Sequence, residues 1–183
     1  IMVVTIAIER FVFYKETDSG SDFADEYCAL MSENKFADAM RLAGNSKGEC
    51  ARIVSAAMEM PGDNTRKFNF MEAQAGLLIA KLRNRVSYLG VIVTMSPLLG
   101  LLGTIVGMIN SFSIFNIKSG QPMAITGGIG EALIATATGL CVAIIALGAH
   151  SYFAQRLDTA ITNMEQCFSA LLEAGSRGGR DEA

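Results

Sequence analysis

The stretch GGIGEALIATATGLCVAIIALGAH, from Gly127 to His150, is apolar except for one charged residue, Glu131, near its start. It is long enough to cross a bilayer, because a transmembrane helix needs about 20 predominantly apolar residues. A carboxylate in hydrocarbon is costly unless it faces protein or water. The stretch therefore predicts either a helix that lies outside the membrane or a transmembrane helix in which Glu131 has a function.

The composition of the chain favours the membrane. Of 183 residues, 51% are apolar and 18% are charged, there is no Trp, and the mean hydropathy is +0.35. The chain is too apolar for an ordinary soluble domain and too polar for a protein made only of spans. The net charge of -3 gives no reason to expect nucleic acid as a partner.

Two long apolar runs and a shorter one predict three transmembrane helices. No charged residue occurs from Val86 to Ile117, and Glu131 is the only one from Ser119 to Gln155. The stretch NIKSGQPM between the runs contains turn residues and is short enough to join antiparallel helices. The opening residues, IMVVTIAI, indicate the inner end of a first span whose outer part is cleaved, disordered or missing. A short buried strand of a soluble domain is the alternative for these residues.

The distribution of basic residues predicts the orientation, because Lys and Arg concentrate on the cytoplasmic side of a membrane. Eleven of the 15 lie between Arg10 and Arg85, one is in the turn, and three are in the carboxyl-terminal tail. The amino end and the turn are therefore expected outside, and the middle and the tail inside. The predicted segments are a truncated first span at 1–14, a cytoplasmic helical region at 15–85, a second span at 86–117, a periplasmic turn at 118–123, a third span at 124–155, and a cytoplasmic helix and tail at 156–183.

The cytoplasmic region is predicted to be a helical bundle without a catalytic or cofactor-binding site. A helix capped by Ser32 is expected to run to Gly44, a second to begin after Gly48 and break at Pro61, and a long third helix to continue into the second span. No phosphate-binding loop and no nucleophile with a base is present, so we expect neither an enzyme nor a cofactor. The four cysteines are far apart, so neither a metal site nor a disulfide is expected.

Small residues form a stripe along each of the two complete spans. Gly100, Gly103 and Gly107 recur at three- or four-residue spacing in the second span, and Gly128 and Gly139 lie on one face of the third. Small residues let transmembrane helices approach closely where lipid provides no hydrophobic drive for association. We therefore predict that these glycines pack helix against helix.

Two threonines, Thr104 and Thr136, interrupt the spans. Each hydroxyl either bonds to the backbone of its own helix or borders a polar lumen. Thr136 follows Glu131 by five positions, about 140° round a helix, so the two cannot share a narrow seam. Both could border a lumen if several copies of the helix form a ring.

The strings SPLLGLLGTIVGMINSF (Ser96 to Phe112) and GGIGEALIATATGLCVAI (Gly127 to Ile144) resemble the two signature spans of the ExbB/TolQ/MotA proton-channel family, and are most similar to its ExbB and TolQ branch. The resemblance implies a pentameric ring in the bacterial inner membrane, around two helices of an ExbD- or TolR-like single-span partner. It implies that the proton-motive force drives transport or maintenance at the outer envelope, in one branch through a TonB-like protein.

By the same resemblance, Thr104 and Thr136 match the family's pore-lining threonines and Glu131 matches its acidic residue. The partner would contribute the membrane aspartate that carries the proton. This sequence departs from the family where Ile145 stands in place of a frequent Pro, and where AHSYF lacks a frequent Asn.

Two other classes of protein stay open. A rotary stator of the MotA type would conduct similarly but drive a motility rotor, and it normally has four spans and a larger cytoplasmic domain. A non-conducting membrane scaffold would need neither the carboxylate of Glu131 nor the two threonines.

Overall fold

The computed structural model describes residues 2–117 and 122–181, with side chains for 2–113 and 127–176. Within these ranges the chain consists of helices and the short connections between them. The helices are α1 (Met2–Thr17), α2 (Ser21–Ser32), α3 (Phe36–Asn45), α4 (Glu49–Glu59), α5 (Asn64–Ile117) and α6 (Pro122–Asp181). The all-helical prediction is confirmed for this part of the chain.

Two of the three predicted spans correspond to helices that could cross a membrane. Within the described residues, α5 and α6 each contain a stretch that is long and apolar enough to cross a membrane. The first span stays a prediction, because α1 has only 16 residues. The predicted turn at 118–123 falls largely on residues 118–121, which lie outside the described residues.

Contacts within the chain divide it into two compact units. The paired-helix unit consists of Ile1–Ala7 and Val86–Tyr152, and the bundle unit consists of Ile8–Arg85 and Phe153–Ala183. Both α5 and α6 pass from one unit into the other without interruption. The division of α5 coincides with the end of its basic stretch, KLRNR, and the start of its uncharged stretch.

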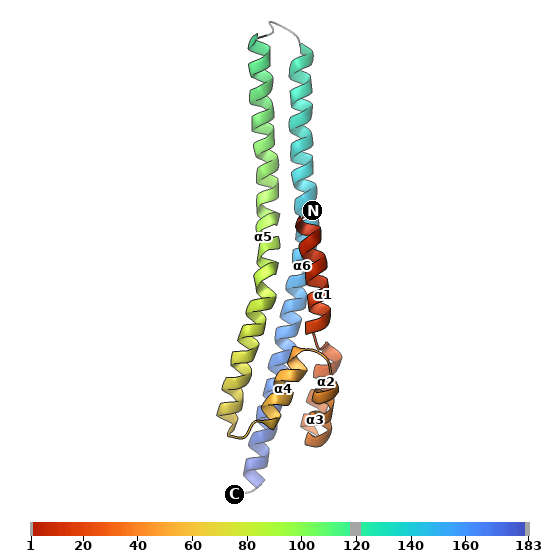
Figure 1. Ribbon diagram of the computed structural model, residues 1–183, viewed down its shortest axis with the longest axis vertical. Helices are drawn as coiled ribbons and strands as arrows, with labels where there is room; N and C mark the ends of the chain where they lie inside the picture. The colour runs from red at the N-terminus through yellow and green to blue at the C-terminus, as the bar shows by residue number, and fades with distance from the viewer. Residues whose placement is uncertain (1, 118–121, 182–183) are drawn as a thin grey trace. The chain divides into compact units, whose positions relative to one another are not determined.

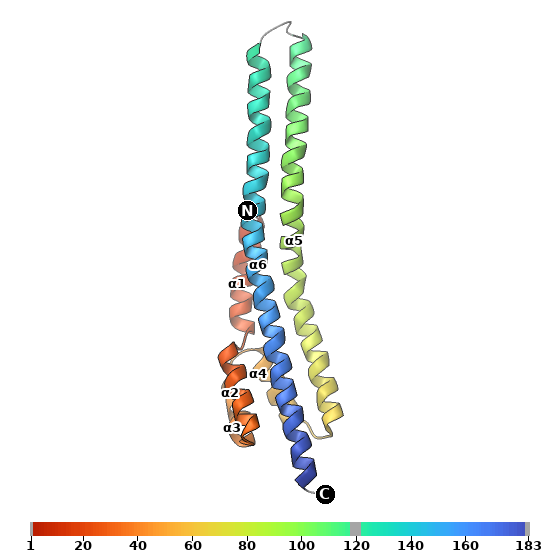
Figure 2. The same ribbon diagram turned by 180° about the vertical axis from the view of Figure 1, so that it is seen from behind.

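In the paired-helix unit, α5 and α6 lie side by side and antiparallel, as the two opposite views show (Figures 1 and 2). The described residues buried between positions 96 and 146 are all small: Ser96, Gly100, Ser111, Ala132, Ala143 and Ala146. Large apolar side chains such as Leu101, Ile105 and Ile144 are exposed instead. The pair is therefore held by close backbone approach, and its large side chains are left for lipid or for other protein surfaces.

The long helix α5 begins where the sequence requires a new start. The chain turns at Gly62, with a φ of 134°, and the carboxylate of Asp63 accepts a hydrogen bond of 3.1 Å from the backbone N–H of Arg66. That bond satisfies one of the free N–H groups at a helix start. Pro97 lies inside the helix, where it has no N–H to donate to the preceding turn.

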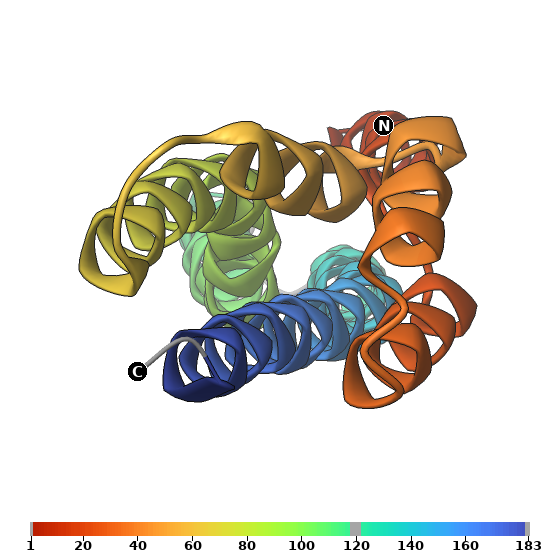
Figure 3. The same ribbon diagram turned by 90° about the horizontal axis from the view of Figure 1, so that it is seen from below.

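The bundle unit has a conventional apolar core. Figure 3 shows its three short helices around the adjoining ends of α5 and α6. The largest fully buried side chains of this unit are Tyr27, Met31, Met71, Leu82, Val54 and Cys167. The Tyr27 ring stacks on Phe23 with centroids 5.7 Å apart, and its hydroxyl contacts the Met58 sulfur at 3.5 Å. Large side chains face inward here, as they do in a water-surrounded bundle.

The predicted start of a helix at Ser32 is wrong. Ser32 is the last residue of α2, and its hydroxyl donates to the carbonyl of Ala29 at 2.7 Å instead of capping a following helix. The chain reverses at Asn34, with a φ of 59°, and α3 begins after Lys35. Asn adopts this left-handed conformation more readily than most residues, so it ends α2.

The sequence analysis did not predict α2, although Phe23, Tyr27 and Met31 recur every four positions and are all buried. The predicted second short helix is confirmed, because α4 begins directly after Gly48 and ends before Pro61. A side chain at Gly48 would collide with the backbone and hydroxyl of Ser19, so only glycine fits this position. The predicted continuous helix leading into the second span is confirmed as α5.

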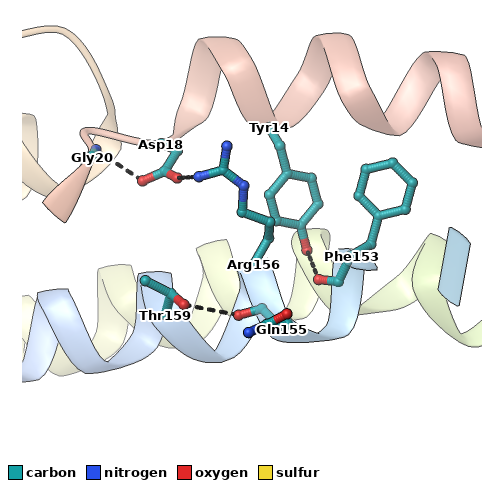
Figure 4. Close-up of polar contacts among 7 residues, drawn as sticks. All are labelled: Tyr14, Asp18, Gly20, Phe153, Gln155, Arg156 and Thr159. Carbon is teal, nitrogen blue, oxygen red and sulfur yellow. Dashed lines mark hydrogen bonds and ion pairs between the residues drawn. The ribbon is translucent and has the colours of Figure 1, made fainter. Parts of the chain in front are cut away.

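Polar contacts join the end of α1 to α6 within the bundle unit (Figure 4). The Tyr14 hydroxyl donates to the carbonyl of Phe153 at 3.4 Å, and the two rings lie 5.6 Å apart. Asp18 accepts from Arg156 at 3.4 Å with one carboxylate oxygen and from the Gly20 N–H at 2.9 Å with the other. The chain is thus tied to α6 where it leaves α1.

Three cysteines that are distant in the sequence converge in the bundle core. Cys28, Cys50 and Cys167 come from α2, α4 and α6, and the Cys167 thiol forms hydrogen bonds with both others. Burial, reinforced by the neighbouring Cys167, raises the pKa of Cys28 to about 11. The hydrogen bond with Cys50 and burial raise the pKa of Cys167. Both thiols are therefore protonated at neutral pH.

These thiols predict a loss of stability in alkali. An unfolded chain releases the Cys28 proton near the ordinary thiol pKa of 9.0, whereas the folded chain holds it to about 11. The folded state then binds more protons, so its free energy of unfolding falls as pH rises through this window and is unaffected below it. We expect Cys28→Ala to show a smaller fall in melting temperature between pH 9 and 11, measured by circular dichroism in detergent. The exposed Cys141 supplies the control, since Cys141→Ala should follow the parent chain. Equal falls in all three proteins would contradict the prediction.

Candidate functional site

Of the glycines in the paired-helix unit, Gly139 lies nearest to the backbone of the neighbouring helix. A Cβ at this position would lie 2.6 Å from the carbonyl oxygen of Ser96 and 3.0 Å from the Cα of Gly100. Both neighbours are backbone atoms, which cannot move aside as a side chain can. A Cβ at Gly100 would in turn lie 3.2 Å from the Cα of Thr136. The two backbones therefore touch over this turn, and they do so because neither helix has a side chain there.

The other three predicted packing glycines lie in the same seam. A Cβ at Gly103 would lie 2.7 Å from that of Ala135, and one at Gly107 would lie 3.0 Å from that of Ala132. Gly128 faces the hydroxyl of Ser111, leaving no room for a Cβ. The structure thus brings all five glycines to the contact between α5 and α6 within one chain.

The two predicted threonines differ in their hydrogen bonds. Thr104 donates to the carbonyl of Leu101 in its own helix at 2.7 Å. Thr136 instead donates across the seam to the carbonyl of Gly100 at 3.3 Å and is partly buried. Thr104 lies one turn beyond Gly100 on the same face of α5. The two hydroxyls therefore flank one short section of the seam.

Glu131 lies apart from the threonines. It is exposed on α6, and its neighbours Leu133 and Ile134 are exposed as well. None of the described ion pairs includes it. Its side chain is thus a single carboxylate on an apolar surface, about 140° round the helix from Thr136. Any group that offsets its charge belongs to another molecule or to a residue outside the described side chains.

The site contains no recognisable chemistry of the metal or cofactor type. Within the described residues, no group of His, Cys, Asp and Glu is arranged to hold a metal ion. The carbonyl of Gly100, which accepts the hydrogen bond of Thr136, was not predicted, because a backbone acceptor leaves no pattern in the sequence. It becomes visible only once the two helices are placed together.

Two long helices that are apolar enough to cross a membrane, with large side chains exposed and small residues between them, are typical of an all-helical membrane protein. The chain belongs to the MotA/TolQ/ExbB proton channel family, whose sequence model matches residues 45–166. The match includes the seam, both threonines and Glu131.

Comparison with individual proteins supports the same family assignment. The chain is 32% identical over 152 residues to an ExbB-like biopolymer transport protein of Synechocystis sp., covering 80% of this chain and 72% of the relative. It is 35% identical over 96 residues to the Tol-Pal system protein TolQ of Haemophilus influenzae, covering 52% and 40%. It is 41% identical over 71 residues to the biopolymer transport protein ExbB of Salmonella typhimurium, covering 38% and 29%. The resemblance inferred from the two signature strings is therefore confirmed at the level of the family.

The seam predicts a sharp difference between two glycines of α6. Gly139→Ala places a methyl group against backbone on α5, and such overpacking typically costs about 1–3 kcal/mol. Gly148 has open space around it, and alanine there favours the helix by up to about 1 kcal/mol. We expect Gly139→Ala to lower the melting temperature of the purified protein in detergent, and Gly148→Ala to leave it unchanged or raise it. Equal melting temperatures would show that the helices do not approach as described.

Proposed function

We propose that this chain is a subunit of a motor driven by the proton-motive force in the bacterial inner membrane. With an ExbD- or TolR-like single-span partner, it would conduct protons and use their energy for transport or maintenance at the outer envelope. Membership of the proton channel family supports the conducting role. Two relatives, a biopolymer transport protein and a Tol-Pal system protein, support the process that we propose it drives.

The observation that carries the proposal is the position of Glu131. A carboxylate within a transmembrane helix is costly, by about 2.5–3.5 kcal/mol at the helix centre and less toward the ends, and such residues face a protein interior or a water-filled cavity. In the single chain Glu131 faces neither, because it is exposed among exposed apolar residues. An assembly in which several chains enclose a wet lumen removes this cost. A non-conducting scaffold would have no use for the charge.

The exposed apolar surface supports assembly with further copies and with lipid. Soluble monomers rarely expose large contiguous apolar patches, whereas spans use such surfaces for lipid and for helix contacts. We propose a cyclic homopentamer around the partner's helices, the number five resting on the family resemblance. A TonB-like protein would be a further partner if the chain serves biopolymer transport.

The roles of the site residues follow from this assembly. Thr104 and Thr136 would border the ion pathway, and Glu131 would take part in proton entry from the periplasmic side. The five packing glycines, Gly100, Gly103, Gly107, Gly128 and Gly139, would hold each subunit's helix pair together so that the pathway residues keep their places.

Replacement of Glu131 by Gln tests the proposal. Gln keeps the size of the side chain and most of its hydrogen bonds but cannot ionise. We expect Glu131→Gln to form pentamers of normal mass in native mass spectrometry, and to abolish proton-driven growth on a substrate that requires energised outer-membrane transport. Glu131→Ala should in addition weaken assembly, because it removes the hydrogen bonds.

Two results would count against this role. Glu131→Gln rings that work at the normal rate would show that the side chain does not titrate during transport. A stable monomer of the parent chain would remove the shared lumen on which the role depends. Impaired swimming with intact outer-membrane transport would favour the rotary stator.

The proposed orientation has its own test. The basic residues place Ser55 in the cytoplasm and Ser119, which lies outside the described residues, in the periplasm. We expect a membrane-impermeant maleimide to label Ser119→Cys in intact cells and to label Ser55→Cys only after lysis. Labelling is counted against the parent chain, which carries the same four native cysteines. The reverse pattern would invert the chain in the membrane.

A further inference from the structure

A small cavity lies inside the bundle unit, where the turn between α1 and α2 meets α4, α5 and α6. Its volume is about 20 Å³. Most of its lining is apolar, but Asp18 and Ser19 of the turn and Asn163 of α6 bring polar groups to it. A cavity needs roughly 10–15 Å³ to hold one water molecule. This cavity therefore accommodates a single water or an ion of similar size, and nothing larger.

Asn163 carries a buried amide group that lacks a partner. Its Nδ2 atom is enclosed and makes no hydrogen bond with the residues that the structure describes. An unsatisfied buried donor is destabilising, and most such groups in native proteins are paired with protein or with ordered water. Water can pair with either end of an amide, because it both donates and accepts, so its fit does not depend on which end is the nitrogen.

Ser19 brings a second donor to the same cavity. Its oxygen accepts a hydrogen bond of 3.2 Å from the backbone N–H of Ala51, the third residue of α4. That N–H is one of those at a helix start that have no partner within the helix, so Ser19 caps α4 from the turn before α2. The hydroxyl hydrogen stays available, since no hydrogen bond given for the described residues uses it.

Asp18 supplies an acceptor. One of its carboxylate oxygens accepts from the Gly20 N–H at 2.9 Å and the other from Arg156 at 3.4 Å (Figure 4). An ionised carboxylate has about four lone-pair sites, so each oxygen can accept a further hydrogen bond. The cavity is thus lined by two donors, one on α6 and one on the turn, and by an acceptor on the turn.

We propose that this cavity binds one water molecule, which accepts hydrogen bonds from Asn163 and Ser19 and donates one to Asp18. About three hydrogen bonds are usual for a buried water. The water joins α6 to the turn and, through the shared hydroxyl of Ser19, to the start of α4. It completes a polar junction that already includes the ion pair of Asp18 with Arg156. This site is independent of the proposed ion conduction.

A monovalent cation such as sodium is the other occupant of this size. Two of the three polar side chains are donors, which direct positive charge toward the cavity, and the carboxylate of Asp18 is already paired with Arg156. Both features oppose a cation and favour a neutral molecule that can accept hydrogen bonds.

Electron cryomicroscopy of the protein as purified tests the site directly, at a resolution that shows other ordered waters. We expect one isolated density peak about 2.6–3.2 Å from both the Asn163 nitrogen and the Ser19 oxygen, the range of such hydrogen bonds. The absence of a peak in a map that shows other buried waters would overturn the proposal. Replacing sodium chloride by choline chloride should leave the melting temperature unchanged, and a lower value in choline would assign a cation instead of water.

Replacement of Asn163 by Leu tests the water by the sign of its effect on stability. Leu is similar in size but cannot bond to the water, so the Ser19 hydroxyl loses its acceptor. We expect Asn163→Leu to lower the melting temperature in detergent by about 2–4 °C. In a dry cavity the same change would remove an unpaired donor and fill space, so a higher melting temperature would contradict the proposal. Asn69→Leu is the matched control, because Asn69 is exposed on α5 and the change in helix propensity is the same. It should not lower the melting temperature.

A double variant distinguishes one shared water from two unrelated losses. Ser19→Ala removes the cap of α4 together with one hydrogen bond to the water, and should melt below the parent chain. Because Asn163 acts through the same water, adding Asn163→Leu should lower the melting temperature little or no further. Two falls that add in full would show that the residues share no ligand, and would overturn the proposal.

Discussion

The contact of Gly139 with the backbone of α5 is the constraint on which the rest of the paired-helix unit depends. A backbone approach this close leaves no space for any side chain, so it fixes the rotation of both helices about their axes. With that rotation set, Thr136 comes within reach of the Gly100 carbonyl and Glu131 is turned away from the seam. The placement of the polar groups is thus a consequence of where glycine occurs.

The helices α5 and α6 bury different kinds of side chain in the two units. In the bundle unit, large side chains such as Tyr27 and Met71 are buried. Between positions 96 and 146 of the paired-helix unit, the buried described residues are small, and large ones such as Leu101 and Ile144 are exposed. Water drives the first arrangement through the hydrophobic effect, and lipid makes the second possible because it is as apolar as leucine. In the described part of α5 the change falls between Leu89, the last large side chain that is fully buried, and Ser96.

The sequence predicted those features that depend on one helix at a time. The length of an apolar run, the spacing of glycines and the break at Pro61 are each visible in one stretch of the sequence. The helices α4 and α5 and the existence of the seam could therefore be predicted from the sequence. Ser32 was predicted to cap the start of a helix, but it ends one. A serine is common at both ends of helices, and the φ of Asn34, which decides between them here, is not visible in the sequence. The convergence of three cysteines and the different partners of Thr104 and Thr136 could not be predicted. They depend on how separate helices are rotated, which no local pattern records.

The position of Glu131 is the reason for proposing that this chain works in an assembly. The hydroxyls of Thr94, Thr104, Ser111, Ser113, Thr136 and Thr138 all donate to backbone carbonyls of the same chain. The carboxylate has no such partner among the described residues, although it lies only five positions before Thr136. These hydroxyls are satisfied within the chain, whereas the group that is most costly in lipid is left exposed. In the proposed assembly, association and ion conduction depend on this same side chain, because the wet lumen that removes its cost is also the path along which a proton would move.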